Sequence, residues 1–157
     1  MLAEGLLGIV TGVITTWLLF LGKALWISKV TPFLREIKYQ GVKIDGAWNG
    51  SSNAKDGETT ARLFLIQSAH ELTGTFFLGI KNTERNSHAD FNVRGYMWEG
   101  YITLNFIPKD RRITSYATSL LKLNDGGLAL AGQFCFRDVQ KEGVTAIEMK
   151  LVREAAN

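Results

Sequence analysis

The chain has 157 residues, of which 46% are apolar and 21% charged, and this composition predicts a single folded domain rather than a disordered segment. One cysteine excludes an internal disulfide and a multi-cysteine zinc site, and two histidines are too few for a histidine-rich metal centre. The net charge of +3 is compatible with an anionic ligand or a lipid surface.

The first thirty residues predict a membrane anchor. Residues 5–22 carry no charge, and eighteen helical residues extend about 27 Å, close to the thickness of a hydrocarbon core. Lys23 has a side chain long enough to snorkel, and Trp26 suits a membrane interface. A secretory signal peptide is the alternative, but such a peptide normally begins with basic residues and ends at a small-residue cleavage site, which this segment lacks.

The charges that flank the span predict its orientation. Only Glu4 precedes the span, whereas several basic residues follow it, so the positive-inside rule places the C-terminal part in the cytoplasm of a single-pass protein. An unpaired Cys135 suits that reducing compartment. The basic residues are Lys23, Lys29, Arg35, Lys38 and Lys43.

One side of the predicted membrane helix carries small residues. Gly5, Gly8 and Gly12 recur at helical spacing, and the last two form a GxxxG pair. Such a stripe lets two helices approach closely, so we expect these glycines to support homo-oligomers in the bilayer. The alternative is that glycine is simply common in membrane helices.

Pro32 separates the span from a short amphipathic stretch at 33–39, which predicts a juxtamembrane helix at the lipid interface. The chain therefore divides into a transmembrane helix over 1–29, a juxtamembrane linker over 30–43 and a ligand-sensing β-domain over 44–157.

After this linker the sequence alternates with period two and is broken by turn residues every eight to twelve positions. Short connections favour antiparallel neighbours, and eight strands can close into a barrel. We predict a mainly β fold: one N-terminal transmembrane helix followed by an eight-stranded antiparallel up-and-down β-barrel. The predicted strands are 46–53, 59–67, 72–80, 88–98, 101–107, 112–123, 128–137 and 143–152.

The turns also predict strand registers. The predicted pairs are Trp98–Tyr101, Tyr96–Thr103 and Arg94–Asn105 across a two-residue turn; Asn105–Thr114, Thr103–Tyr116 and Tyr101–Thr118 across a four-residue turn; Leu123–Leu128 and Leu121–Leu130; and Leu63–Phe76, Leu65–Gly74 and Gln67–Leu72. The second of these turns is residues 108–111.

These registers gather aromatic and polar side chains on one surface of three strands, the polar-aromatic face. Aromatic rings stack on bases and arginine binds phosphate, so the face is the candidate ligand-binding site. The alternative is an ordinary solvated sheet face, since Thr and Tyr are good strand formers. The face comprises Arg94, Tyr96, Trp98, Tyr101, Thr103, Asn105, Arg112, Thr114 and Tyr116, with Thr118 beside them.

Lesser candidates, which could line a lumen, are Trp48, Gln67 and Ser52. For Trp48 the alternative role is a plug of the barrel.

Catalytic motifs are absent from the sequence, which has no GxSxG, HExxH, P-loop or GxGxxG pattern. His70 lies in a predicted turn with no partner placed to make it a base, and Cys135 has no basic neighbour in sequence that could activate it. We therefore expect a binding protein rather than an enzyme, with no metal and no cofactor.

Two resemblances extend this interpretation. The runs GAWNG at 46–50 and LTGTFF at 72–77 resemble the GxW…LTGT pattern of avidin- and lipocalin-like barrels, a likeness of fold. The plan as a whole, with VTPFLREI at 30–37 and IDGAWNG at 44–50, resembles the transmembrane β-barrel effectors of bacterial cyclic-nucleotide anti-phage defence, CBASS and related systems.

The second resemblance implies an antiviral effector of the bacterial inner membrane. In that family the cytoplasmic barrel senses a cyclic nucleotide, and the membrane helices assemble and disrupt the bilayer. The expected partners are a cyclic nucleotide, with a cyclic dinucleotide as first candidate, the lipid bilayer and further copies of the chain, but no nucleic-acid polymer. The alternatives are a membrane-anchored barrel that binds an apolar small molecule in its lumen, and an oligomeric membrane scaffold.

Overall fold

The structure, a computed structural model, forms two compact units, Met1–Gln40 and Gly41–Asn157, each with its own architecture. The first unit is helical and the second is a β-barrel. The residues that the structure describes are 2–54, 57–81, 86–110, 112, 116–138 and 142–154.

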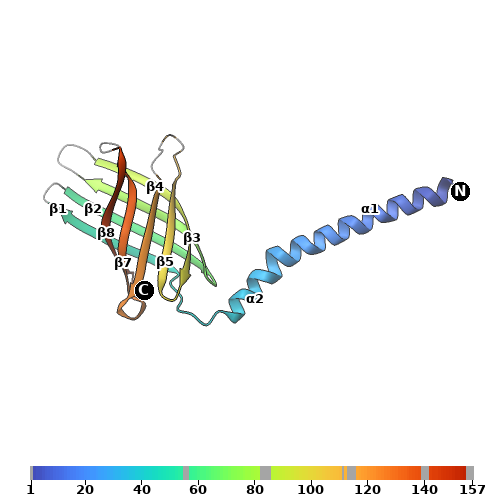
Figure 1. Cartoon of the computed structure of the whole chain (residues 1–157), viewed down its shortest axis with the longest axis horizontal. Coiled ribbons are helices and arrows are strands. Elements are labelled where there is room, and N and C mark those ends of the chain that lie inside the picture. The colour runs from blue at the N-terminus through green and yellow to red at the C-terminus, as the bar shows by residue number, and fades with distance from the viewer. Residues whose placement is uncertain are drawn as a thin grey trace. The chain divides into compact units, whose positions relative to one another are not determined.

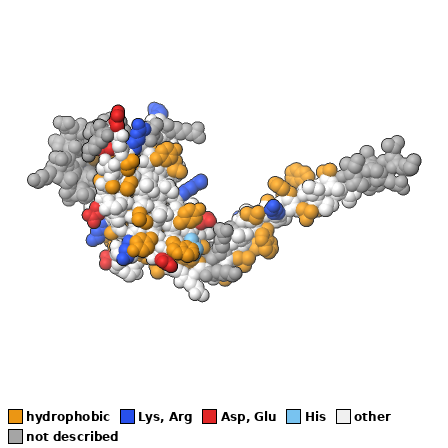
Figure 2. All heavy atoms as spheres, in the orientation of Figure 1, with side chains coloured by type: hydrophobic (Ala, Val, Ile, Leu, Met, Phe, Trp, Pro, Cys, Tyr) orange, Lys and Arg blue, Asp and Glu red, His pale blue; other side chains and the backbone are white. Residues whose placement is uncertain are grey.

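The helical unit contains a segment that is long and apolar enough to cross a membrane. Helix α1 (Leu2–Leu25) continues into a π-helical turn, η1 (Trp26–Val30), and the span judged by length and composition is Val10–Val30. Figure 2 shows patches of hydrophobic side chains along the described part of this unit. Two hydroxyls within the span are satisfied locally, because Thr15 and Thr16 donate to backbone carbonyls one turn earlier, both at 2.8 Å.

The sequence indicated a break at Pro32, but the backbone remains helical there. It passes through the π turn into helix α2 (Thr31–Lys38). Proline has no amide hydrogen to give to the carbonyl four residues earlier, and its ring crowds that carbonyl. The wider π turn accommodates this defect: the backbone N–H of Thr31 and its Oγ1, at 3.2 Å, both donate to the Trp26 carbonyl. The predicted juxtamembrane helix is therefore present and begins two residues earlier.

The second unit is a closed barrel of eight antiparallel strands in sequence order, which confirms the predicted fold class (Figure 1). Each predicted strand has its counterpart, and the largest difference is the start of β6, at Ala117 rather than 112. The strands are β1 (Gly46–Ala54), β2 (Gly57–Ser68), β3 (Glu71–Lys81), β4 (Asn86–Trp98), β5 (Tyr101–Pro108), β6 (Ala117–Asn124), β7 (Ala129–Asp138) and β8 (Gly143–Arg153), with a 3₁₀ turn η2 (Asp125–Gly127) between β6 and β7.

Two hairpins have the predicted register. The β2–β3 pairs and the β4–β5 pairs are those expected from the sequence. In the β4–β5 turn both Glu99 and Gly100 have positive φ, 50° and 79°, which gives a two-residue turn whose twist matches the flanking strands.

Two other hairpins correct the predicted registers. Asn105 pairs with Thr118 rather than Thr114, because β5 ends at Pro108 and β6 begins only at Ala117, so more than four residues separate the two strands. Leu123 pairs with Leu130 rather than Leu128, because the four turn residues are 125–128 rather than the predicted 124–127. Both shifts are by an even number of residues, so each side chain stays on its predicted side of the wall.

Aromatic rings fill the centre of the barrel. Phe76 packs against Phe106 with ring centroids 4.9 Å apart, and Phe106 packs against Phe134 at 5.1 Å, both edge to face. Burial of each such side chain contributes about 2–3 kcal/mol to folding. The core lies entirely within the barrel unit, so the barrel has the apolar interior of an independent domain.

Trp48 and Arg153 close the end of the barrel at which the linker joins β1, called here the linker end. The indole of Trp48 is fully buried, and its Nε1 donates to the Ile44 carbonyl at 3.0 Å, which confirms Trp48 as a plug. The Arg153 guanidinium lies over the indole ring at 5.6 Å and donates to the carbonyls of Asp45, at 2.6 Å, and Lys43, at 3.3 Å.

The β1–β8 seam is the shortest ladder of the barrel. Only Trp48–Arg153 and Asn49–Val152 pair across it, whereas the other neighbouring strands pair over six residues or more. The two pairs lie at the linker end, beside the Arg153 contacts. The barrel is therefore closed at one end of the seam by a small group of side chains.

We expect Arg153→Ala to lower the free energy of unfolding by about 2 kcal/mol, because it removes charge-assisted hydrogen bonds and a cation–π contact at this seam. Chemical denaturation followed by tryptophan fluorescence measures the change. Arg137→Ala, at an exposed position on β7, is the control and should change stability by less than about 0.5 kcal/mol. Equal effects of the two substitutions would contradict the role assigned to Arg153.

Candidate functional site

The central part of the polar-aromatic face lies together on the outer wall of β4 and β5. Trp98 pairs with Tyr101, Tyr96 with Thr103 and Arg94 with Asn105, as predicted. All six side chains are exposed, Trp98 to 65%. The face is therefore an open surface of rings and one guanidinium, on the opposite side of the wall from the apolar core.

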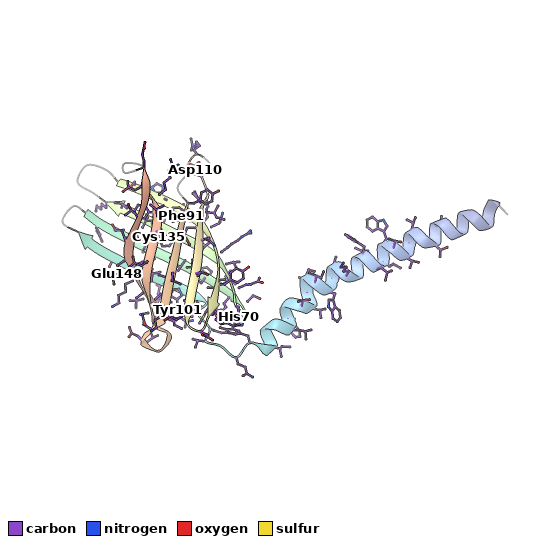
Figure 3. The ribbon with its side chains drawn as sticks, in the orientation of Figure 1. His70, Phe91, Tyr101, Asp110, Cys135 and Glu148 are labelled. Carbon is purple, nitrogen blue, oxygen red and sulfur yellow. The ribbon has the colours of Figure 1, made fainter. Side chains whose placement is uncertain are left out.

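Two residues that sequence reasoning missed extend this surface at the linker end. The ring of His70, in the β2–β3 turn, lies 4.7 Å from the Trp98 ring, and His70 Nδ1 donates to the Met97 carbonyl at 3.0 Å. Lys122 pairs with Tyr101 and places its Nζ 5.9 Å from that ring. Figure 3 shows His70 and Tyr101 at this end of the barrel.

The C-terminal part of the predicted face is placed differently. Arg112 lies in the β5–β6 connection, 92% exposed, and not on a strand. Tyr116 precedes β6 and does not pair with Thr103, whose partner is Leu120. Thr114 lies outside the described residues. The structure thus brings Thr118, opposite Asn105, into the row of Arg94, but not Arg112 or Tyr116.

Arg112 is instead engaged with Asp110. Its Nε and Nη2 each donate to one carboxylate oxygen of Asp110 at 3.2 Å, and its backbone N–H donates to Oδ1 at 2.9 Å. Side-chain and then backbone hydrogen bonds from Arg112 lower the pKa of the Asp110 carboxyl below its ordinary value. Figure 3 shows Asp110 at the end of the barrel opposite His70.

A groove that the sequence did not indicate crosses the outer wall of β1–β4. Its volume is about 320 Å³, and three phenylalanines, two cations and two carboxylates border it. Asn49, Arg62, Phe77 and Asp90 form one row of paired residues across the four strands. The lining residues are Ala47, Asn49, Arg62, Leu63, Phe64, Thr75, Phe76, Phe77, Asp90, Lys109 and Glu154.

The lesser candidates do not line an open lumen at the linker end. Gln67 holds the linker, because its Oε1 accepts the Ile44 N–H at 2.8 Å and its Nε2 donates to the Ala69 carbonyl at 2.8 Å. Trp48 fills the interior beside it. The side chain of Ser52 lies outside the described part of the chain.

The predicted oligomerisation stripe falls within one continuous helix. Gly5, Gly8 and Gly12 all lie in α1, so their spacing places them along one side of it. A side-chain atom added at Gly12 would meet nothing within 4 Å in the single chain.

Comparison with protein-family models, with curated proteins and with solved structures finds no match for this chain. Within the described residues, no three His, Cys, Asp or Glu side chains are placed to share a metal ion.

We expect Arg112→Ala to raise the pKa of Asp110 toward its ordinary value. In the folded wild type the lowered pKa means that the Arg112 interaction is present above the unfolded-state pKa and is lost as the pH falls through the folded-state value. Carboxyl-carbon NMR titration measures the pKa of Asp110 in the wild type and in the variant. An unchanged Asp110 pKa in the variant would exclude Arg112 as the cause.

Proposed function

We propose that this protein is a membrane-anchored antiviral effector whose barrel senses a cyclic nucleotide, with a cyclic dinucleotide as first candidate. One observation carries the proposal: a contiguous surface of Tyr, Trp and Arg side chains on a barrel whose chain also contains a helix apolar enough to span a bilayer. The resemblance in plan to CBASS-type effectors supplies the function class.

The described residues have suitable chemistry for such a ligand. The aromatic faces of Tyr96, Trp98 and Tyr101 offer stacking surfaces to bases. Such surfaces accept any base, because every base has a π face. The Arg94 guanidinium offers two parallel donors to a phosphate. Lys122, beside Tyr101, adds a second cation at the linker end.

In this proposal the barrel faces the cytoplasm of a bacterial cell and α1 spans the inner membrane. Ligand shifts the population toward an assembled state if it binds that state more tightly than the unassembled one. In the assembled state, helices that meet through Gly5, Gly8 and Gly12 disrupt the bilayer.

Calorimetry on the full chain in lipid nanodiscs, with a panel of cyclic di- and trinucleotides, tests the sensing step. We expect micromolar or tighter binding of one compound, weakened at least about tenfold by Arg94→Ala or Tyr96→Ala, since each removes about 1.5 kcal/mol or more of contact.

Arg62→Ala, in the groove of the neighbouring wall, is the matched control and should leave the affinity unchanged. Binding that is lost in Arg62→Ala and kept in Arg94→Ala would place the ligand in the groove instead. No heat with any compound would reject the sensing role.

Gly8→Ile and Gly12→Ile test the membrane step. Each puts a branched side chain in the path of a neighbouring helix, so we expect fewer cross-linked oligomers in detergent and less depolarisation of cells that express the protein with its signal. Deletion of residues 1–27 should abolish toxicity. Thr16→Val, which keeps the volume of a nearby side chain, is the control; undiminished cross-linking in both glycine variants would contradict the proposed assembly.

A further inference from the structure

The barrel interior has two unequal halves. Near the linker end, inward-facing side chains such as Trp48 and Leu72 are fully buried. Toward the other end, Ile80 and Ile147 are 42% and 46% exposed although the strand pairing directs them inward. Ile147 is paired with the core residue Phe134, and paired residues share a face of the sheet.

Three more inward-facing side chains, Leu78, Ala89 and Phe136, are only partly buried although they pack on the core. A side chain that points into a barrel and is still exposed borders space that its neighbours do not fill. With Ile80 and Ile147 these residues define the open half of the interior. These five side chains are apolar. The same inner face also carries Thr59, Thr145 and Asp138, and Thr145 Oγ1 donates to Asp138 Oδ2 at 3.1 Å.

The open half has an aromatic floor and small residues on its wall. Phe76, Phe91, Phe106 and Phe134 form a cluster with ring centroids 4.9–6.4 Å apart, and this cluster separates the open half from the linker end. Ala61 and Ala117, each 8% exposed, lie on strands of the wall beside it. An eight-stranded barrel is wide enough for one small ligand where side chains are short.

β1 and β8 are paired over only part of the seam beside this space. β1 and β8 pair only at Trp48–Arg153 and Asn49–Val152, so the N-terminal part of β8, which carries Ile147, has no ladder to β1 among the described residues.

A buried hydroxyl lies next to this apolar space. Ser119 is 3% exposed, its Oγ is the one buried side-chain polar atom of the described residues without a hydrogen-bond partner, and it shares the inner face with its pair Phe134. An orphaned buried hydroxyl is unfavourable, so a partner that supplies the missing hydrogen bond stabilises the folded state. Ser119 is two residues from Ala117 on the same side of β6.

We propose that the open half binds one small molecule that has an apolar, ring-sized body and a single hydrogen-bonding group, which pairs with Ser119 Oγ. The Phe floor accepts a further ring edge to face. None of these residues belongs to the polar-aromatic face, so the test of this site is independent of the test of nucleotide binding.

Methyl NMR of the full chain in nanodiscs, labelled at isoleucine δ1, tests the site with indole and with indene, which has nearly the same shape but no N–H. We expect saturable shifts at Ile80 and Ile147, and none of comparable size at Ile102, which is fully buried on β5. Indole should bind about fivefold more tightly than indene, the ratio expected for one net hydrogen bond.

Two variants locate the ligand. Ser119→Ala should remove the preference for indole and leave the affinity for indene unchanged, since it deletes the hydroxyl without opening the wall. Ala89→Leu should fill the space and reduce binding of both probes at least tenfold, and Ile147→Phe serves the same purpose from the opposite wall. Val144→Leu, at an exposed outward position on β8, is the matched control and should bind as wild type does.

Absence of saturable shifts at Ile80 and Ile147 would overturn the site, as would undiminished binding by Ala89→Leu and Ile147→Phe. Equal affinities for indole and indene in the wild type would overturn the pairing with Ser119. Neither of these results would bear on nucleotide binding or on its dependence on Arg94, which calorimetry tests separately.

Discussion

The barrel depends on the packing of one guanidinium against one indole. Arg153, the last residue of β8, lies over Trp48 and binds two carbonyls of the incoming linker, so it joins the last strand to the first. The β1–β8 ladder adds only two residue pairs. Closure of this seam therefore relies on side chains at the linker end as well as on the short ladder.

The sequence predicted the fold well because each of its signals is local. Alternation within strands and turn residues between them identify all eight strands, and the positive-φ turn at Glu99–Gly100 determines the β4–β5 register. Registers failed where the turn chemistry was ambiguous. Residues 109–116 contain a turn held by Asp110 and Arg112, and a short motif such as PKDR does not reveal how far the connection extends beyond it.

Of the candidate site, the sequence correctly predicted only the part that lies on the β4–β5 hairpin. Arg94, Tyr96, Trp98 and Tyr101 lie together because two adjacent strands share a short turn, whereas Lys122 reaches Tyr101 through a register that was shifted by four residues. The groove combines residues from 47 to 154 and exists only after the barrel closes. The partly filled interior was equally inaccessible, because alternation says which side chains point inward but not how completely they fill the space.

The π turn before Pro32 has a geometric consequence for the two helices that it joins. A π turn inserts one residue into the helical repeat, and one residue corresponds to about 100° of rotation about the axis. The stripe of Phe33, Leu34 and Ile37 on α2 is therefore out of phase with the glycine side of α1. The same continuous helical segment can thus present its small residues on one side and the apolar side chains of α2 on another.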